Sequence, residues 1–261
     1  MWACPASNPL AETPAVQGRY MPREEESDGY ISEFTAEPIT SNCRSIYRRR
    51  EHLVVVVSPG NSYFRTPIMT RLLDWADRTF RHVAVLHPDT GLECSFTAIG
   101  YSPDRARLRA RREISQSRRR VRRAWDQANV PIQRRLEVLV SEFMNHPAYR
   151  SVLKTAEEQM QRDLRFRTMC QGVTRDAIAH WALHAGRQIP HLDDPPLDYI
   201  LAELPFFLAS PQILQTSSST MCYHRRLEFI EYLYHSGGPL KPKRNQGFVR
   251  LRSAHPAEGQ E

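Results

Sequence analysis

A serine stands where a buried run of four valines gives way to a turn, and a hydroxyl at such a place can act as a nucleophile. This residue is Ser58, and Pro59, Gly60 and Asn61 follow it. Pro59 has no N–H, but the backbone amides of Gly60 and Asn61 are candidates to stabilise the oxyanion of a tetrahedral intermediate. The alternative is a serine that only caps the turn. The G-x-S-x-G motif of α/β-hydrolases is not met, because Val56 occupies its first glycine position.

Further downstream, other side chains have spacings that suit chemistry. Tyr199 and Glu203 lie four residues apart in a helical pattern, which places them on one face of the helix. Tyr223 lies in a strand pattern, where a tyrosine often serves only in packing. His180 and His184 are also four apart, but the residues between them lack the glutamate of HExxH, so we expect no metal.

Basic charge is concentrated in one segment. Ten arginines and one acid, Glu113, lie between residues 105 and 123, and they contribute +9 to a net charge of +7, which leaves −2 for the rest. Leu108, Ile114, Val121 and Trp125 have mostly helical spacing, so we expect a helix over 104–129 that docks on the core. A solvated, non-functional face is the alternative.

This helix suits a phosphate backbone, and RNA fits better than duplex DNA. Arginine binds phosphate in a bidentate manner, and no zinc finger, RRM or KH signature for reading bases is visible. A structured RNA, bound through shape and charge, is therefore expected, with a log–log salt slope of roughly −3 to −5. The residues predicted to contact it are Arg118, Arg119, Arg120, Arg122 and Arg123.

The elements around the serine predict an α/β fold. A strand over 51–57, a helix over 67–80 and a strand over 82–86 form a βαβ unit, which implies a parallel sheet. Ligands bind at the carboxyl edge of such sheets, where Ser58 would lie. Further predicted helices cover 132–145, 147–165, 167–186, 193–208 and 225–234, and further strands cover 217–223 and 247–251.

Composition is typical of one globular domain. We expect a flexible extension over residues 1–40, a single domain over 41–252 and a disordered tail over 253–261. The longest apolar run, 53–57, is far shorter than the roughly 20 residues of a membrane span, so a soluble cytoplasmic protein without membrane contact is expected. The five cysteines include no CxxC pair and are expected to be free thiols.

Several segments together resemble the signatures of the cyclodipeptide synthases. Residues 54–64 resemble the first signature, 199–205 the second and 222–224 the third, while 146–150 resembles the segment that carries another active-site tyrosine. The arginine-rich helix falls where the family has its tRNA-binding helix. The resemblance covers about residues 45–252, and Asn61, Tyr223 and His224 indicate the subgroup defined by Asn, Tyr and His.

The resemblance implies a single Rossmann-like domain with a central parallel sheet and a helical layer. The family is similar to the catalytic domain of class I tyrosyl- and tryptophanyl-tRNA synthetases without ATP binding. In agreement, the chain has no GxGxxG, Walker or adenylate-forming signature. The implied partners are two aminoacyl-tRNAs, with no ATP and no metal cofactor. A monomer is expected, and tailoring enzymes are expected to act on the product.

The resemblance also implies catalytic roles. Ser58 would attack the first aminoacyl-tRNA ester and hold the residue as an aminoacyl-enzyme. Tyr199 and Glu203 would bind its α-amino group, and Glu203 would accept a proton when the aminoacyl group of the second aminoacyl-tRNA is transferred to that amine. Tyr223 would assist the cyclisation that releases a diketopiperazine. The remaining implied site residues are Asn61, Tyr149 and His224, and the last two would be positioning groups.

The first aminoacyl pocket departs from the family at Val56, where the family often has glycine. Val54, Val56 and Ser58 alternate onto one face of the strand, so Val56 should narrow this pocket and favour a small apolar residue. Its other predicted walls are Val140, Phe206 and Met221. A second pocket is expected near Val173 and Trp181.

Two other functions remain open on the sequence. The chain would be a non-catalytic tRNA-binding protein if it kept the fold without the chemistry. It would be a serine esterase for small acyl groups if a histidine and an acid formed a triad with Ser58. No motif proposes such a triad.

Overall fold

The computed structural model describes residues 34–236 and 238–253. The predicted flexible extension lies outside the described residues as far as residue 33, as does the predicted tail from residue 254 onward. The prediction is wrong for residues 34–38, which form strand β1 (Phe34–Pro38). This strand pairs antiparallel with the last strand and buries Phe34, so the folded unit begins before residue 41.

A six-stranded sheet forms the centre of the fold, in the order β1-β6-β5-β2-β3-β4. Every neighbouring pair is parallel except β1 with β6, which agrees with the predicted α/β class. The parallel strands are β2 (His52–Val56), β3 (His82–His87), β4 (Arg135–Leu139), β5 (Ser219–Tyr223) and β6 (Gln246–Ser253).

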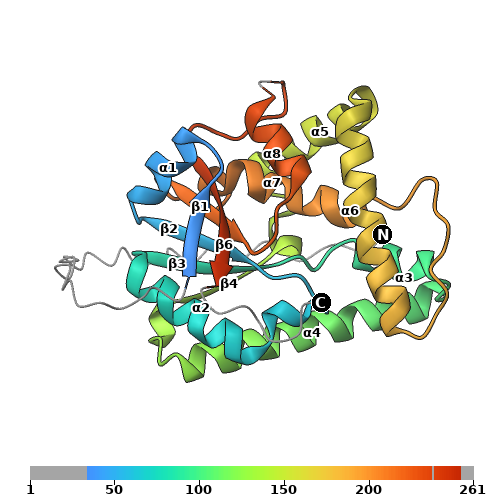
Figure 1. The fold of residues 1–261 in the computed structure, drawn as a ribbon, viewed down its shortest axis with the longest axis horizontal. Helices are drawn as coiled ribbons and strands as arrows, with labels where there is room; N and C mark the ends of the chain where they lie inside the picture. Colours follow the sequence, from blue (N-terminus) through green and yellow to red (C-terminus); the bar gives the residue numbers. More distant parts are fainter. Residues whose placement is uncertain (1–33, 237, 254–261) are drawn as a thin grey trace, which may run out of the picture. The chain divides into compact units, whose positions relative to one another are not determined.

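Helices cover both faces of the sheet because its central strands are apolar on both sides. Val54 and Val56 of β2 face one core cluster, and Leu53 and Val55 face the other. In Figure 1, α2 and α4 lie along one side, and α5, α7 and α8 lie on the other. The helices are α1 (Ser41–Arg48), α2 (Thr66–Thr79), α3 (Leu92–Ala98), α4 (Pro103–Gln127), α5 (Pro147–Arg162), α6 (Leu164–His184), α7 (Asp198–Ile213) and α8 (Glu228–His235).

One predicted helix is wrong. Residues 132–145 contain the edge strand β4 between two short 3-10 turns, Ile132–Arg134 and Val140–Phe143. The strand pairs with β3 along its whole length. Its side chains alternate, with Val138 buried in the core and Glu137 facing the opposite way.

The arginine-rich helix α4 is a packed element of 25 residues. Val121 and Trp125 are buried against α2 and the sheet, as predicted. Leu108 was expected to face the core but is 50% exposed, and the small residues Ala106 and Ala110 are buried against α3 and α6 instead. The small alanine side chains allow α3 and α6 to approach this half of α4 closely, and Leu108 lies on the exposed side.

Within the described residues, no helix is long and apolar enough to cross a membrane. Four cysteines are free thiols there: Cys43, Cys170 and Cys222 are buried, and Cys94 is half-buried. The same part of the chain contains no group of three or more His, Cys, Asp or Glu side chains placed to hold a metal ion.

Candidate active site

Ser58 lies at the carboxyl end of β2, in a tight turn. The amide of Asn61 donates to the carbonyl of Ser58 at 3.2 Å, and Gly60 has a φ of +74°. Pro59 followed by a positive-φ glycine is typical of a type II turn. The turn uses the Asn61 N–H, so the prediction that this amide serves the oxyanion is wrong. The Gly60 N–H has no acceptor among the described residues and remains a candidate.

Trp181 of α6 packs closely against Gly60 of this turn. A Cβ added to Gly60 would lie 2.0 Å from the indole ring. We expect Gly60→Ala to lower the free energy of unfolding by at least about 1–2 kcal/mol, because alanine disfavours positive φ and the ring must move. It should also reduce activity by shifting Ser58. Denaturant unfolding and product assays check both effects.

Gly172, on the same helix as Trp181, provides a matched control. A Cβ there meets nothing within 4 Å. Gly172→Ala should raise stability by about 0.5–1 kcal/mol, since alanine is the better helix former. Equal changes in the free energy of unfolding for the two alanine variants would contradict the close packing of Trp181 on Gly60.

Tyr223 is a side-chain hydrogen-bond partner of Ser58. The two hydroxyl oxygens, Ser58 Oγ and Tyr223 Oη, lie 2.9 Å apart. Tyr223 ends β5, which pairs parallel with β2, so both side chains reach the same edge of the sheet. Burial raises the pKa of Tyr223, and the hydrogen bond with Ser58 opposes this shift. The pair is therefore a neutral hydroxyl couple able to pass a proton.

His224 is a neutral, positioned group. Asn61 Oδ1 accepts from the Tyr63 amide at 2.9 Å, so its Nδ2 is left to donate to His224 Nε2 at 3.4 Å. The Tyr63 and His224 rings stack at 4.0 Å. Burial lowers the pKa of His224 to about 3. Because this imidazole faces Asn61 and not Ser58, it does not form an esterase triad.

Glu203 is a buried carboxyl with a free acceptor. It is 8% exposed, and its Oε1 atom has no hydrogen-bond partner among the described residues. Burial raises the pKa of Glu203 to about 8, opposed by a hydrogen bond from Tyr199. Tyr199 lies one turn earlier on α7, and burial raises the pKa of its hydroxyl well above the usual value. An ammonium group placed beside Glu203 would stabilise its ionised form.

Tyr149 supports the backbone of the site without lining the cavity. Its side chain is completely buried, and its hydroxyl donates to the carbonyl of Ala202 at 2.9 Å. Ala202 precedes Glu203 on α7, so the bond holds the backbone that carries this carboxyl. Tyr149 does not line the cavity, which fits the positioning role implied for it.

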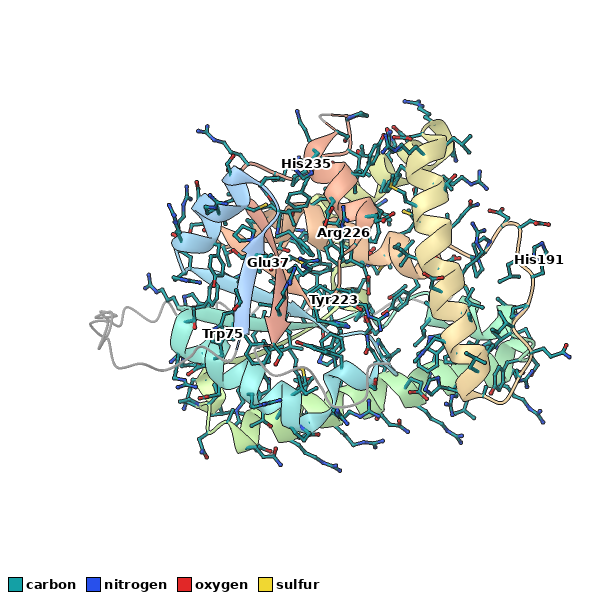
Figure 2. All side chains as sticks on the ribbon, in the orientation of Figure 1. Glu37, Trp75, His191, Tyr223, Arg226 and His235 are labelled. Atoms are coloured by element: carbon teal, nitrogen blue, oxygen red, sulfur yellow. The ribbon has the colours of Figure 1, made fainter. Side chains whose placement is uncertain are left out.

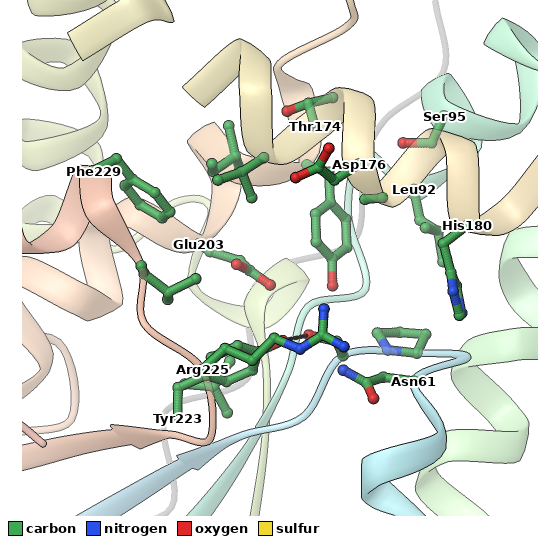
Figure 3. A pocket seen from close by; sticks show the side chains of 18 of the residues that line it. Asn61, Leu92, Ser95, Thr174, Asp176, His180, Glu203, Tyr223, Arg225 and Phe229 are labelled. Atoms are coloured by element: carbon green, nitrogen blue, oxygen red, sulfur yellow. Dashed lines mark hydrogen bonds between the residues drawn. The ribbon is translucent and has the colours of Figure 1, made fainter. Parts of the chain in front are cut away.

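A cavity of about 290 Å³ brings the predicted site together. Figure 3 shows Glu203, Asn61, Tyr223 and Arg225 turned towards the same space. Figure 2 shows that Tyr223 lies in the interior of the described fold. The predicted residues that line the cavity are Val56, Ser58, Asn61, Val173, Trp181, Tyr199, Glu203 and Tyr223.

The predicted first pocket is only partly correct. Val56 lines the cavity, but Val54 lies four residues before Ser58, about 13 Å deeper in the strand. The other predicted walls outside the cavity lining are Val140, Phe206 and Met221, and all three are fully buried in the core below it. The walls on this side are instead Ile200, Phe207 and Phe229.

Helix α3 supplies wall residues that sequence reasoning missed. Leu92 and Ser95 line the cavity, while Phe96 and Ile99 pack beneath them. The apolar residues 92, 96 and 99 have helical spacing, and this was the available signal. Asp176 and Arg225 at the cavity carried no pattern that could have marked them.

The five predicted tRNA contacts differ in their surroundings. Glu137 of β4 pairs with Arg118 and Arg122. In the described part of the chain, no carboxylate lies within ion-pair distance of Arg119, Arg120 or Arg123. Of these five predicted contacts, three thus have no carboxylate partner in the described part of the chain, and two are held by one acid.

Comparisons with known proteins show which family the chain is similar to. A family model described as "Cyclodipeptide synthase" matches residues 34–253. The chain is 30% identical to a cyclo(L-leucyl-L-leucyl) synthase of Bacillus subtilis, covering 83% of this chain and 88% of the relative. It is 32% identical to a cyclo(L-tyrosyl-L-tyrosyl) synthase of Mycobacterium tuberculosis, covering 88% and 78%.

Solved structures are similar over the same region. A cyclodipeptide synthase from Bacillus thermoamylovorans superposes with a TM-score of 0.77 at 27% identity, covering 85% of this chain and 97% of that one. A Mycobacterium tuberculosis protein superposes with a TM-score of 0.70 at 30% identity, covering 85% and 94%. That structure is described as demonstrating that cyclodipeptide synthetases are related to type I tRNA synthetases.

Proposed function

The chain belongs to the cyclodipeptide synthase family, and we propose that it builds a cyclic dipeptide from two aminoacyl-tRNAs through an aminoacyl-enzyme on Ser58. The observation that carries this proposal is the pairing of Ser58 with Tyr223 beside the buried carboxyl of Glu203, whose Oε1 atom has no hydrogen-bond partner among the described residues. An aminoacyl-tRNA is an ester that is already activated. The reaction therefore requires neither ATP nor a metal ion.

In the first half-reaction, Ser58 Oγ attacks the ester carbonyl of the first aminoacyl-tRNA. A new seryl ester forms, the bond to the ribose oxygen breaks, and the tRNA leaves with its hydroxyl restored. The Ser58 proton passes through the hydroxyl of Tyr223, 2.9 Å away, towards the leaving oxygen. The Gly60 N–H is the amide at this turn that is free to stabilise the oxyanion.

In the second half-reaction, the α-amino group of the seryl ester attacks the ester carbonyl of the second aminoacyl-tRNA, and the bond to the ribose oxygen breaks. Glu203 accepts the proton that this amine loses and returns it to the ribose oxygen, so the second tRNA leaves with its hydroxyl restored. The new free amine then attacks the seryl ester, releases the diketopiperazine and returns Ser58 to its hydroxyl form. Each cis peptide of the ring costs about 2.5–4 kcal/mol, and the intramolecular geometry of the closing step offsets this cost.

The free arginines of α4 are the proposed tRNA contacts. We expect the double variant Arg119→Ala/Arg120→Ala to weaken tRNA binding and to flatten the log–log salt slope by about 1.5–2, because two phosphate contacts are lost. Filter binding over a range of salt concentrations measures both quantities. Arg44→Ala/Arg48→Ala, on α1, is the control and should leave binding unchanged. Equal loss in both variants would refute docking on α4.

The cavity favours an apolar first residue, because Val56, Ile200, Phe207 and Phe229 form one side of it. We further propose that the enzyme works as a monomer in the cytoplasm, where aminoacyl-tRNAs are available. Its product, a neutral and stable ring, is then a substrate for tailoring enzymes.

Expression in a bacterium, followed by mass spectrometry of the medium, tests the proposed function. A cyclic dipeptide that depends on the protein is the expected result. A folded protein that binds tRNA without making product would be the non-catalytic alternative. Hydrolysis of small acyl esters without tRNA would indicate the esterase.

A further inference from the structure

Helix α4 and the edge strand β4 are joined by one carboxylate that holds two arginines. Arg118 Nε donates to Glu137 Oε2 at 3.0 Å, and Arg122 Nε donates to Glu137 Oε1 at 2.7 Å. The two arginines are four residues apart, so they lie on one face of α4 with about 6 Å of rise between them. Each oxygen of the carboxylate thus holds one arginine of the proposed RNA-binding helix.

The side chains of this cluster become more exposed from the strand outward. Glu137 is 17% exposed, Arg118 is 32% exposed and Arg122 is 58% exposed. Each arginine donates to Glu137 through its Nε atom, and its guanidinium has four further N–H donors. Glu137 therefore fixes the inner side of each arginine and leaves donors that face solvent.

Burial and hydrogen bonds determine the charges of the Glu137 and His87 side chains in this cluster. Burial acts to raise the pKa of Glu137, but hydrogen bonds from Arg122 and Arg118 lower it overall, so the carboxyl is ionised. His87 lies inside the cluster, with its Nε2 atom 3.9 Å from Glu137 Oε2. Burial lowers the pKa of His87 to about 4, which keeps it neutral. The cluster thus has two cations and one anion.

We propose that Glu137 is a positioning residue that orients Arg118 and Arg122 for the phosphate backbone of the aminoacyl-tRNA. This inference rests on the proposed function. A free arginine has about 2 kcal/mol of rotamer entropy to lose on binding, and a side chain already held loses less. The Nη groups that each held guanidinium leaves free can still bind phosphate oxygens in a bidentate manner.

The positioning role and simple electrostatics predict opposite changes in tRNA binding when the Glu137 side chain is removed. Glu137→Ala removes a negative charge beside the RNA-binding helix, so charge alone would tighten binding. If Glu137 orients the arginines, the same change should instead raise KM for aminoacyl-tRNA about five- to twentyfold, with kcat at saturating tRNA unchanged. Glu137→Gln keeps an oxygen acceptor for one arginine, and its KM should lie between those of the unaltered enzyme and the alanine variant.

Glu37 provides a matched control. It also bridges two arginines, Arg250 and Arg252, and is labelled in Figure 2. Glu37 lies on β1, which is the opposite edge strand of the sheet from β4. Glu37→Ala should leave KM unchanged. Thermal unfolding of both alanine variants separates loss of binding from loss of structure.

An enzyme that lacks both arginine side chains tests whether Glu137 acts through them. In an Arg118→Ala/Arg122→Ala enzyme, adding Glu137→Ala should raise KM no further. An unchanged or lower KM for Glu137→Ala in the unaltered enzyme would overturn the inference, as would an equal effect in both backgrounds. An unaltered protein that makes no cyclic dipeptide and binds no aminoacyl-tRNA would overturn the proposed function itself.

Discussion

Cyclic dipeptide formation should fall by at least about a thousandfold when Ser58 is replaced by alanine, because the acceptor of the first aminoacyl group is lost. The geometry supports this size of effect. Ser58 closely follows a strand buried on both faces, and its hydrogen-bond partner Tyr223 is itself mostly buried. Mass spectrometry of the product measures the loss.

The intermediate provides an independent readout. Intact-protein mass spectrometry of the unaltered enzyme with one aminoacyl-tRNA should detect a single aminoacyl adduct, and Ser58→Ala should show none. Ser62 is the matched control, since it lines the same cavity four residues later. Ser62→Ala should keep both the adduct and the product. Product from Ser58→Ala would remove this residue from the nucleophile role.

Glu203→Gln should give the second large effect, with activity and stability moving in opposite directions. The amide cannot accept a proton from the α-ammonium group, so kcat/KM should fall about 100-fold or more. Burial raises the pKa of Glu203 from 4.5 to about 8. Below pH 4.5 the carboxyl is protonated in both the folded and unfolded chain. As pH rises from 4.5 to 8, only the unfolded chain loses the proton, so folding loses stability.

The glutamine variant does not undergo this loss. Its free energy of unfolding should exceed that of the unaltered enzyme at about pH 8, by on the order of 4 kcal/mol, and the difference should vanish near pH 4.5. Denaturant unfolding at the two pH values tests this. Glu158→Gln, an exposed position on α5, should change neither activity nor the pH profile. A pH-independent stability difference would show that Glu203 ionises normally in the folded protein.

The βαβ unit around Ser58 was predictable because its signals are local. Valine runs, helical spacing and a Pro-Gly turn lie within 40 residues and agree with one another. Strand β4 was not predictable in the same way, since its alternation covers only Arg135–Leu139 and is flanked by 3-10 turns. Missing this strand also meant that Glu137, and with it the pairing of Arg118 and Arg122, could not be foreseen.

The site residues depended on resemblance more than on local pattern. Tyr199, Glu203 and Tyr223 meet Ser58 at one cavity although more than 140 residues separate them from it in the chain. The walls were harder to predict. Phe206 was chosen for the cavity, yet its neighbour Phe207 lines it, because a step of one residue on α7 turns the side chain by about 100°.

Strand β2 lies between β3 and β5, and its valines are almost completely buried. Amides in such a strand exchange with solvent only when the whole domain opens. Ser58, the proposed nucleophile, therefore follows a strand that opens only at a high cost in free energy, whereas the opposite cavity wall belongs to α6, where His180 and Asp176 are exposed. In the proposed mechanism, adaptation to different aminoacyl side chains would fall to this helical wall, while the seryl ester would form next to the more rigid strand.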